Sequence, residues 1–168
     1  MSTRSRIGIE DHNGRVRSIY CHWDGYPEGV GKTLLEHYAD PSKIEELIKL
    51  GSISVLDAEI GEKQDFDARN RDANWTLAYH RDRGEPLEVK RSNSAETYHR
   101  LATKGWEEYT YLFRQGVWFV AEVGGGAGPF LVTAKDPQGK APIKWQNLTG
   151  LLQFVAPTGR SYAFGDSF

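Results

Sequence analysis

Cysteine is nearly absent from this chain, since Cys21 is the only one among 168 residues. A single thiol cannot form an internal disulfide and cannot supply a cysteine-rich zinc site. An excess of one charge is also missing, because 21 lysine and arginine residues stand against 23 aspartate and glutamate residues, for a net charge of -2. This balance argues against nucleic acid as a partner and equally against an acidic mimic of DNA.

Long hydrophobic runs are missing as well. No apolar run approaches the length needed to cross a bilayer, and no hydrophobic region follows the basic N-terminal residues 1–6, so neither a membrane partner nor a signal peptide is expected. Apolar residues make up 39% of the chain and charged residues 26%, which is typical of a folded protein. We therefore expect one cytoplasmic domain spanning residues 1–168, large enough to fold without a cofactor or metal.

Alternating apolar and polar residues predict two β-hairpins. The first covers residues 6–23, where Asn13-Gly14 is typical of a type I′ turn. The second covers residues 108–123 and has a three-residue connection at 114–116. Further strands are predicted over residues 75–80 and 130–133.

Helical spacing of apolar residues predicts four short helices, over residues 34–38, 41–50, 94–104 and 146–154. Asp40 and Ser94 are typical N-cap residues. In the third helix, the side chains expected to face the core are Thr97, Tyr98 and Leu101. Residues 57–74 mix charges of both signs and predict a long exposed loop. The order of elements predicts an α+β fold, with a mainly antiparallel sheet built from two hairpins and short helices packed on one face.

A polar loop follows the first hairpin, where a strand leaves the sheet. Its candidate binding residues are His22, Asp24, Tyr26 and Glu28. Loops at strand ends commonly carry function, so this segment is a candidate surface for a partner protein. The alternative is structural, with His22 and Asp24 hydrogen-bonded to the turn and holding the loop in place.

A second charged cluster ends the strand predicted over residues 75–80. It contains His80, Arg81, Asp82, Arg83 and Glu85. In a functional interpretation, the two guanidinium groups bind a small phosphate- or carboxylate-bearing molecule, and the carboxylates orient His80 as an acid or base. In a structural interpretation, the charges pair with one another in a solvated turn, where each pair contributes little stability.

Two apparent chemical motifs fail on their geometry. Five residues separate Gly25 from Gly31, whereas a phosphate-binding loop needs four, and Pro27 removes one amide from that loop. Cys21 and His22 are adjacent in a strand and point to opposite faces, so they cannot form a thiolate–imidazole pair. The histidines of the chain also lack the i, i+4 spacing of a helical metal site, so no metal is expected.

Four segments are distinctive when taken together: residues 1–5 (MSTRS), 19–31 (IYCHWDGYPEGVG), 78–85 (AYHRDRGE) and 108–113 (EYTYLF) followed by Trp118. This combination resembles a family of small proteins carried by bacteriophages and prophages. The resemblance implies a phage or mobile-element accessory protein in the bacterial cytoplasm, and it assigns no catalytic residue. Accessory phage proteins of this size often bind and block a host or defence component, which is an inference by association.

The leading hypothesis is therefore a non-enzymatic accessory protein that binds a bacterial host or defence protein through the His22–Glu28 loop and the His80–Glu85 turn. The alternative is a small enzyme or ligand-binding protein, in which Arg81 and Arg83 clamp an anionic molecule. An enzyme requires the two segments to converge in one pocket. A third possibility is that both segments only stabilise the fold and that the functional surface lies in residues 57–74.

Overall fold

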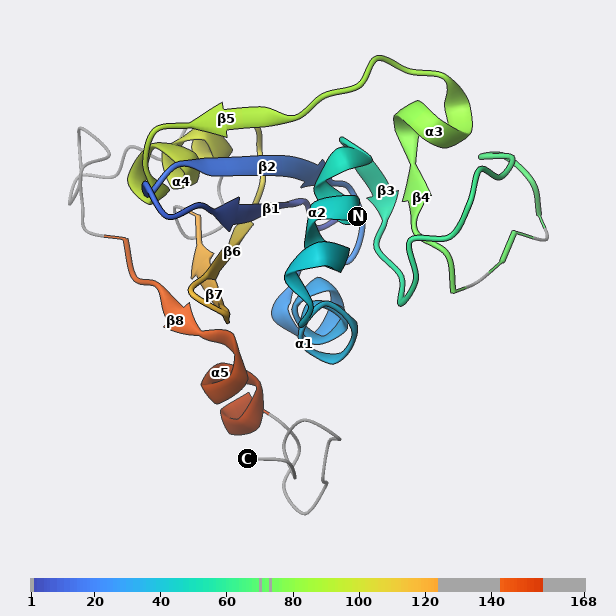
Figure 1. The fold of residues 1–168 in the computed structure, drawn as a ribbon. Helices are drawn as coiled ribbons and strands as arrows, with labels where there is room; N and C mark the ends of the chain where they lie inside the picture. Colours follow the sequence, from blue (N-terminus) through green and yellow to red (C-terminus); the bar gives the residue numbers. More distant parts are fainter. Residues whose placement is uncertain (1, 70, 73, 124–142, 156–168) are drawn as a thin grey trace.

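The computed structural model describes residues 2–69, 71–72, 74–123 and 143–155. In this part of the chain eight strands form one sheet, in the order β4–β3–β2–β1–β6–β7–β8, with β5 beside β2 (Figure 1). The strands are β1 (Ser5–Glu10), β2 (Val16–Cys21), β3 (Ile53–Val55), β4 (Leu77–Ala78), β5 (Lys90–Ser92), β6 (Tyr109–Arg114), β7 (Val117–Glu122) and β8 (Gln146–Asn147). The α+β prediction is confirmed.

Both predicted hairpins are present, as β1–β2 and β6–β7, but the sheet that they build is mixed. β1 runs parallel to β6, with Ile7 opposite Tyr111, and β2 runs parallel to β3. The chain between the hairpins passes through helices and short strands before it returns, so β6 enters the sheet in the direction of β1. Antiparallel pairing therefore holds within each hairpin, and a parallel pair joins the two hairpins.

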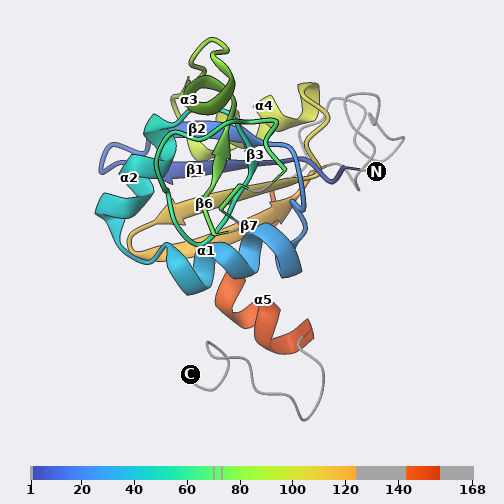
Figure 2. The same ribbon diagram turned by 90° about the vertical axis from the view of Figure 1, so that its right-hand side faces the viewer.

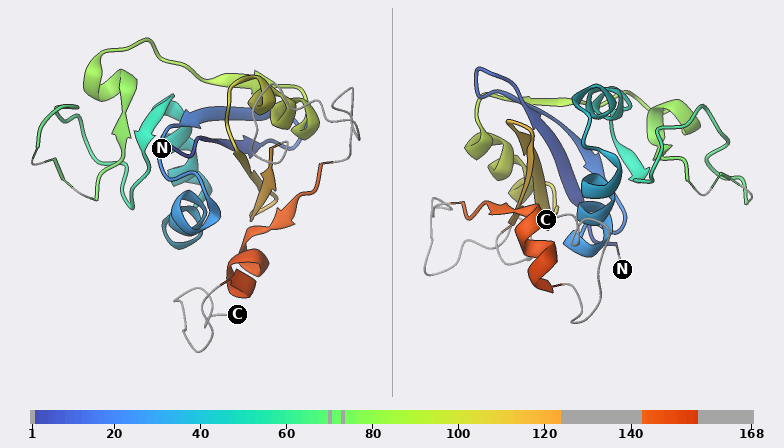
Figure 3. Two further views of the ribbon diagram at one scale, coloured as in Figure 1. Left: turned by 180° about the vertical axis from the view of Figure 1, so that it is seen from behind. Right: turned by 60° about the horizontal axis from the view of Figure 1, so that its bottom comes forward.

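The helices cover both faces of the sheet, and the prediction of helices on one face is wrong in this respect (Figures 2 and 3). They are η1 (Pro27–Gly31, a single π-helical turn), α1 (Lys32–His37), α2 (Pro41–Lys49), α3 (Tyr79–Arg83), α4 (Ala95–Lys104) and α5 (Leu148–Val155). Side chains alternate along a strand, so Ile7 and Ile9 join the core beneath α1 and α2. Gly8 faces the other side, where the Tyr98 ring of α4 lies close to its Cα.

Helix boundaries follow their predicted caps. The Asp40 carboxylate accepts a hydrogen bond from the Ser42 backbone at 2.9 Å, and the Ser94 hydroxyl accepts one from the Thr97 backbone at 3.1 Å. The core face of α4 differs from the prediction, because Thr97 is exposed and Leu101 is only partly buried. The buried residues of this helix are Tyr98, His99 and Ala102.

The strand predicted over residues 75–80 is shorter than expected. β4 covers only Leu77–Ala78, and the chain then turns into α3, which ends at Gly84 in a left-handed conformation. Residues 57–69, 71–72 and 74 contain no helix or strand, as predicted for this loop. The strand predicted over residues 130–133 lies outside the described residues. Among the described residues, no helix combines the length and apolar character that a membrane span requires.

Candidate functional site

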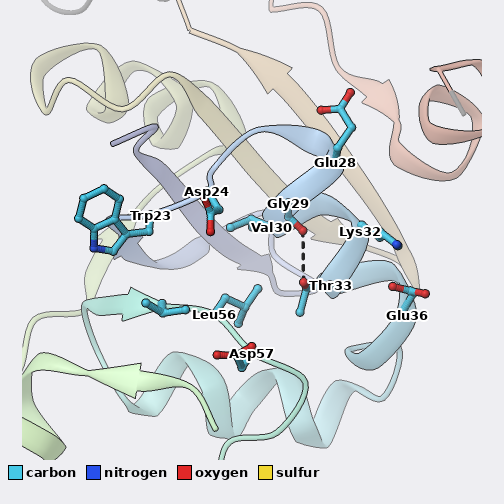
Figure 4. A pocket seen from close by; sticks show the side chains of 11 residues that line it. Trp23, Asp24, Glu28, Gly29, Val30, Lys32, Thr33, Glu36, Leu56 and Asp57 are labelled. Carbon is cyan, nitrogen blue, oxygen red and sulfur yellow. Dashed lines mark hydrogen bonds between the residues drawn. The ribbon is translucent and has the colours of Figure 1, made fainter. Parts of the chain in front are cut away.

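A cavity of about 290 Å³ lies between the loop after β2, the start of α1 and the segment after β3 (Figure 4). Trp23 stands at one end of this cavity, while Lys32 and Glu36 stand at the other (Figure 4). Asp24 and Asp57 lie on opposite walls. Residues from two stretches of the chain, 23–36 and 55–57, therefore meet in one hollow, which we call the Trp23 cavity.

The first wall of the Trp23 cavity is a tightly bonded loop. Asp24 has a positive φ of 58°, and its carbonyl oxygen accepts a hydrogen bond from the Val30 backbone at 2.8 Å. This bond brings Gly29 so close that a Cβ atom at residue 29 would lie 2.3 Å from the Asp24 carbonyl oxygen. The Tyr26 hydroxyl donates to the Asp24 carboxylate at 3.3 Å. The loop is therefore ordered by its own backbone before any ligand arrives.

The second wall is the segment that follows β3. The hydroxyl of the buried Tyr38 donates to the Asp57 carbonyl oxygen at 2.7 Å. The Asp57 backbone N–H donates to the Thr76 hydroxyl oxygen at 3.0 Å. These bonds hold the main chain of Asp57, while its carboxylate has no hydrogen-bond donor among the described residues.

The carboxylate of Asp57 is difficult to ionise. Burial raises its pKa to about 6 from the ordinary 3.8, and the negative charges of Asp24 and Asp72 act in the same direction. The positive charge of Arg71 opposes this rise. The effect of Asp24 on Asp57 shows that the two walls interact electrostatically across the cavity.

The lining of the Trp23 cavity is acidic. Its charged side chains are Asp24, Glu28, Glu36 and Asp57, against the single ammonium group of Lys32. Trp23 adds an indole ring whose residue is 42% exposed. An anion would meet a repulsive surface here, whereas a cation would meet carboxylates and an aromatic face.

The four candidate residues of the loop after β2 have different environments. Asp24 and Glu28 line the cavity, and Tyr26 is exposed beside them. His22 is not among the lining residues. Its Nδ1 atom lies 2.6 Å from the Tyr20 hydroxyl, and its ring meets the Trp23 ring edge-on with centroids 4.8 Å apart. Burial, with a smaller effect of the Arg4 charge, lowers the pKa of His22, so this ring supports Trp23 in its neutral form.

The charged cluster at His80–Glu85 does not line the cavity. Arg81 carries five N–H groups, and they make five hydrogen bonds: two to the Asp82 carboxylate and three to the carbonyl oxygens of Thr76, Ile60 and Gly61. No N–H group of this guanidinium is left for an anion.

The rest of the cluster is also bonded internally. The buried Asp82 carboxylate accepts from the backbone N–H groups of Gln64 and Ala78. Arg83 pairs with Glu85, and the Nδ1 atom of His80 lies 2.7 Å from the Glu85 carbonyl oxygen. These contacts match the structural interpretation in that the charges pair with one another, but the Arg81–Asp82 pair is buried rather than solvated, with side chains 15% and 0% exposed. The geometry gives the anion-binding alternative no support at Arg81.

Sequence patterns did not indicate every residue of this site. Asp57 sits at the start of the predicted loop, and Thr76 lies in the predicted strand over residues 75–80. Their meeting depends on the pairing of β3 with β4, strands of three and two residues that are too short to leave a pattern. The sequence shows that Asp57 is charged, but it does not show that Asp24 lies on the opposite wall of the cavity.

Two chemistries find little support at this site. Within the described segments, no group of three or more His, Cys, Asp or Glu side chains is arranged to hold a metal ion. Cys21 is fully buried on the face opposite His22, and burial raises the pKa of its thiol to about 12, so it is a poor nucleophile.

Comparison with protein-family models, with curated proteins and with solved structures gives no match. The function of the chain must therefore be inferred from its own residues.

Proposed function

We propose that the protein is a phage or mobile-element accessory protein that acts by binding a bacterial protein, and that a lysine or arginine side chain of this partner enters the Trp23 cavity. The phage setting and the bacterial cytoplasm rest on the sequence resemblance. The binding mode rests on the geometry of the cavity. The observation that carries it is the lining, to which four acidic residues and one exposed tryptophan contribute against a single lysine.

Electrostatics favour a cationic group over other ligands. Carboxylates form charge-assisted hydrogen bonds with ammonium and guanidinium groups, which are roughly twice as strong as bonds between neutral groups. An indole face attracts the same cations, by about 0.5–1 kcal/mol at exposed sites. Lys32 can neutralise only part of the charge of the four carboxylates.

The size of the hollow favours a side chain over a cofactor. Its volume of about 290 Å³ is at the lower limit of pockets for small molecules, which begin at roughly 300 Å³. The hollow is also open to solvent and sits beside two exposed aromatic residues, Trp23 at 42% and Tyr26 at 39%. Tryptophan and tyrosine are enriched at the energetic centres of protein interfaces.

The order of the loop reduces the cost of binding. Segments that become fixed only on association lose conformational entropy at that moment. Here the Val30 amide and the Tyr26 hydroxyl already hold Asp24 in place. A partner therefore meets a surface whose charged group is oriented in advance.

Gentle purification of the tagged protein from a bacterial lysate, followed by native mass spectrometry, tests this proposal. We expect a stoichiometric protein companion that is lost with Trp23→Ala and retained with Trp106→Ala. Trp106 is a matched control, because it is 48% exposed and lies outside the cavity. A companion that stays bound equally to Trp23→Ala and Trp106→Ala contradicts the proposed surface.

A further inference from the structure

One buried residue, Thr76, joins the wall of the Trp23 cavity to the charged cluster at His80–Glu85. Thr76 is fully buried, and its hydroxyl contacts the Asp57 backbone N–H at 3.0 Å and the Asp57 carbonyl oxygen at 3.2 Å. The carbonyl oxygen of Thr76 accepts from the Arg81 Nη2 group at 2.6 Å. Thr76 therefore bonds Asp57 with its side chain and Arg81 with its main chain.

Arg81 holds the same segment at a second point. Its Nη1 group donates to the Ile60 carbonyl oxygen at 2.8 Å and to the Gly61 carbonyl oxygen at 3.3 Å. The Asp82 carboxylate fixes the guanidinium from the other side and is itself anchored by the Ala78 backbone at 2.8 Å. The start of the loop after β3 is thereby tied to β4 and α3, which lie beside it (Figure 1).

We propose that Thr76 and Arg81 are positioning residues of the Trp23 cavity, which hold the main chain of Asp57 so that its carboxylate faces the ligand. This inference rests on the proposed function. It gives the charged cluster at His80–Glu85 a role in binding without contact to the ligand. The Asp57 carboxylate has no hydrogen-bond donor of its own among the described residues, so its place at the cavity depends on the backbone position that Thr76 holds together with the Tyr38 hydroxyl (Figure 4).

The ionisation of Asp57 reports its position independently of any ligand. Burial is the largest cause of its raised pKa, and the Asp24 and Asp72 charges add to it while the Arg71 charge opposes it. When the wall loosens, water reaches the carboxyl group and the pKa moves toward 3.8. A structural role of Thr76 elsewhere in the fold would leave this pKa unchanged.

The test is a pH titration of the Asp57 carboxyl carbon by NMR in the wild-type protein, Thr76→Val and Thr76→Ser. Valine keeps the shape of threonine without its hydroxyl, and serine keeps the hydroxyl. We expect the Asp57 pKa to fall by about one unit or more in Thr76→Val and to stay near the wild-type value of about 6 in Thr76→Ser. We also expect the affinity for N-acetylarginine amide to fall about fivefold or more in Thr76→Val only.

An unchanged Asp57 pKa in Thr76→Val, in a protein whose amide spectrum shows the native fold, overturns the inference. Arg81→Lys is the second variant in case Thr76→Val fails to fold, since lysine keeps the charge but offers only three donors. A fall in the Asp57 pKa in either variant supports the positioning role. If the pKa falls but the wild-type protein does not bind N-acetylarginine amide, the proposed function is refuted and the positioning role stands.

Discussion

At the scale of single residues, burial of the Asp57 carboxyl group disfavours the charged form that the proposed cation binding requires. Its carboxyl group has a folded-state pKa of about 6 and an ordinary value of 3.8. Between these two pH values the folded protein binds the proton more tightly than the unfolded chain does. The free energy of unfolding contributed by Asp57 therefore falls as the pH rises from about 4 to about 6. At neutral pH the protein keeps a charge that destabilises its fold.

Replacing Asp57 by asparagine separates the two effects. We expect Asp57→Asn to raise the free energy of unfolding at pH 7 by about 1 kcal/mol, a figure that allows for solvent screening of a partly buried group. The gain should vanish below about pH 4, where the aspartate is protonated in both states. Urea denaturation at pH 7 and pH 3.5 measures it, with the exposed Asp67→Asn as control. A gain that is equal at both pH values contradicts the assigned ionisation of Asp57.

Asp24 and Glu28 could be identified from the sequence as candidate binding residues, but their proximity to Asp57 in one cavity could not. A polar loop after a strand indicates a functional surface, and both residues line the cavity. The role of Arg81 was not accessible, because an arginine that binds three backbone carbonyls looks the same in sequence as one that binds an anion. Its carbonyl partners lie 5, 20 and 21 residues away along the chain.

At the scale of elements, the two hairpins use different turns from those expected. Gln115 and Gly116 both have positive φ, 50° and 80°, as a two-residue type I′ turn requires. At the first hairpin only Gly14 has a positive φ. The Asp11 carboxylate closes that five-residue loop by accepting hydrogen bonds from the backbone N–H groups two and four residues later. The side chain of Asp11 therefore overrides the preference of Asn13-Gly14.

One substitution in each turn, Gln115→Asn and Asn13→Gln, gives a matched pair of variants. Asparagine tolerates positive φ better than glutamine, so we expect Gln115→Asn to raise the free energy of unfolding by about 0.5 kcal/mol. Asn13→Gln should change it by less than about 0.3 kcal/mol, because Asn13 has no positive φ to favour asparagine. Chemical denaturation of both variants measures the difference. A larger loss in Asn13→Gln than the gain in Gln115→Asn contradicts this assignment of the turns.

Long elements could be predicted from their periodicity, and short elements could not. The hairpin strands and the helices α2 and α4 each have six or more residues, enough to show apolar alternation or a capped helical repeat. β3, β4 and α3 have three, two and five residues, and they form because tertiary contacts hold them. Only β3 of these short elements contributes to the lining, through Val55 and the following residues Leu56 and Asp57, whose position depends on its pairing with β4, so this wall was missed.

At the scale of the whole molecule, one buried ion pair joins the two hairpins. Arg6 of β1 and Glu107, just before β6, form a salt bridge of 3.0 Å with side chains that are 8% and 3% exposed. Burial raises the pKa of Glu107, and the Arg6 charge opposes that rise. The Arg6 guanidinium also donates to the Ser18 hydroxyl at 3.2 Å. The pair therefore fixes the parallel junction of β1 with β6 from one face of the sheet.

Breaking this pair on one side should cost more than removing it entirely. We expect Glu107→Ala to lower the free energy of unfolding by about 3 kcal/mol, because Arg6 remains buried without its countercharge. The double variant Arg6→Met/Glu107→Leu should lose less, since two apolar side chains avoid the unpaired charge. Urea denaturation of both proteins measures the comparison. A double variant that is less stable than Glu107→Ala shows that the ion pair itself stabilises the junction.

We propose above that the Trp23 cavity accepts a positively charged side chain of a partner. The most direct measurement follows the indole N–H signal of Trp23 by NMR while N-acetylarginine amide is added, with N-acetylcitrulline amide as a neutral control of nearly the same shape. We expect a saturable shift with the arginine compound that weakens at high salt and below about pH 6, where Asp57 becomes protonated. We expect no saturable shift with the citrulline compound. Equal responses to the two compounds, or no response to the arginine compound at low salt and pH 7.5, would contradict a cation site in this cavity.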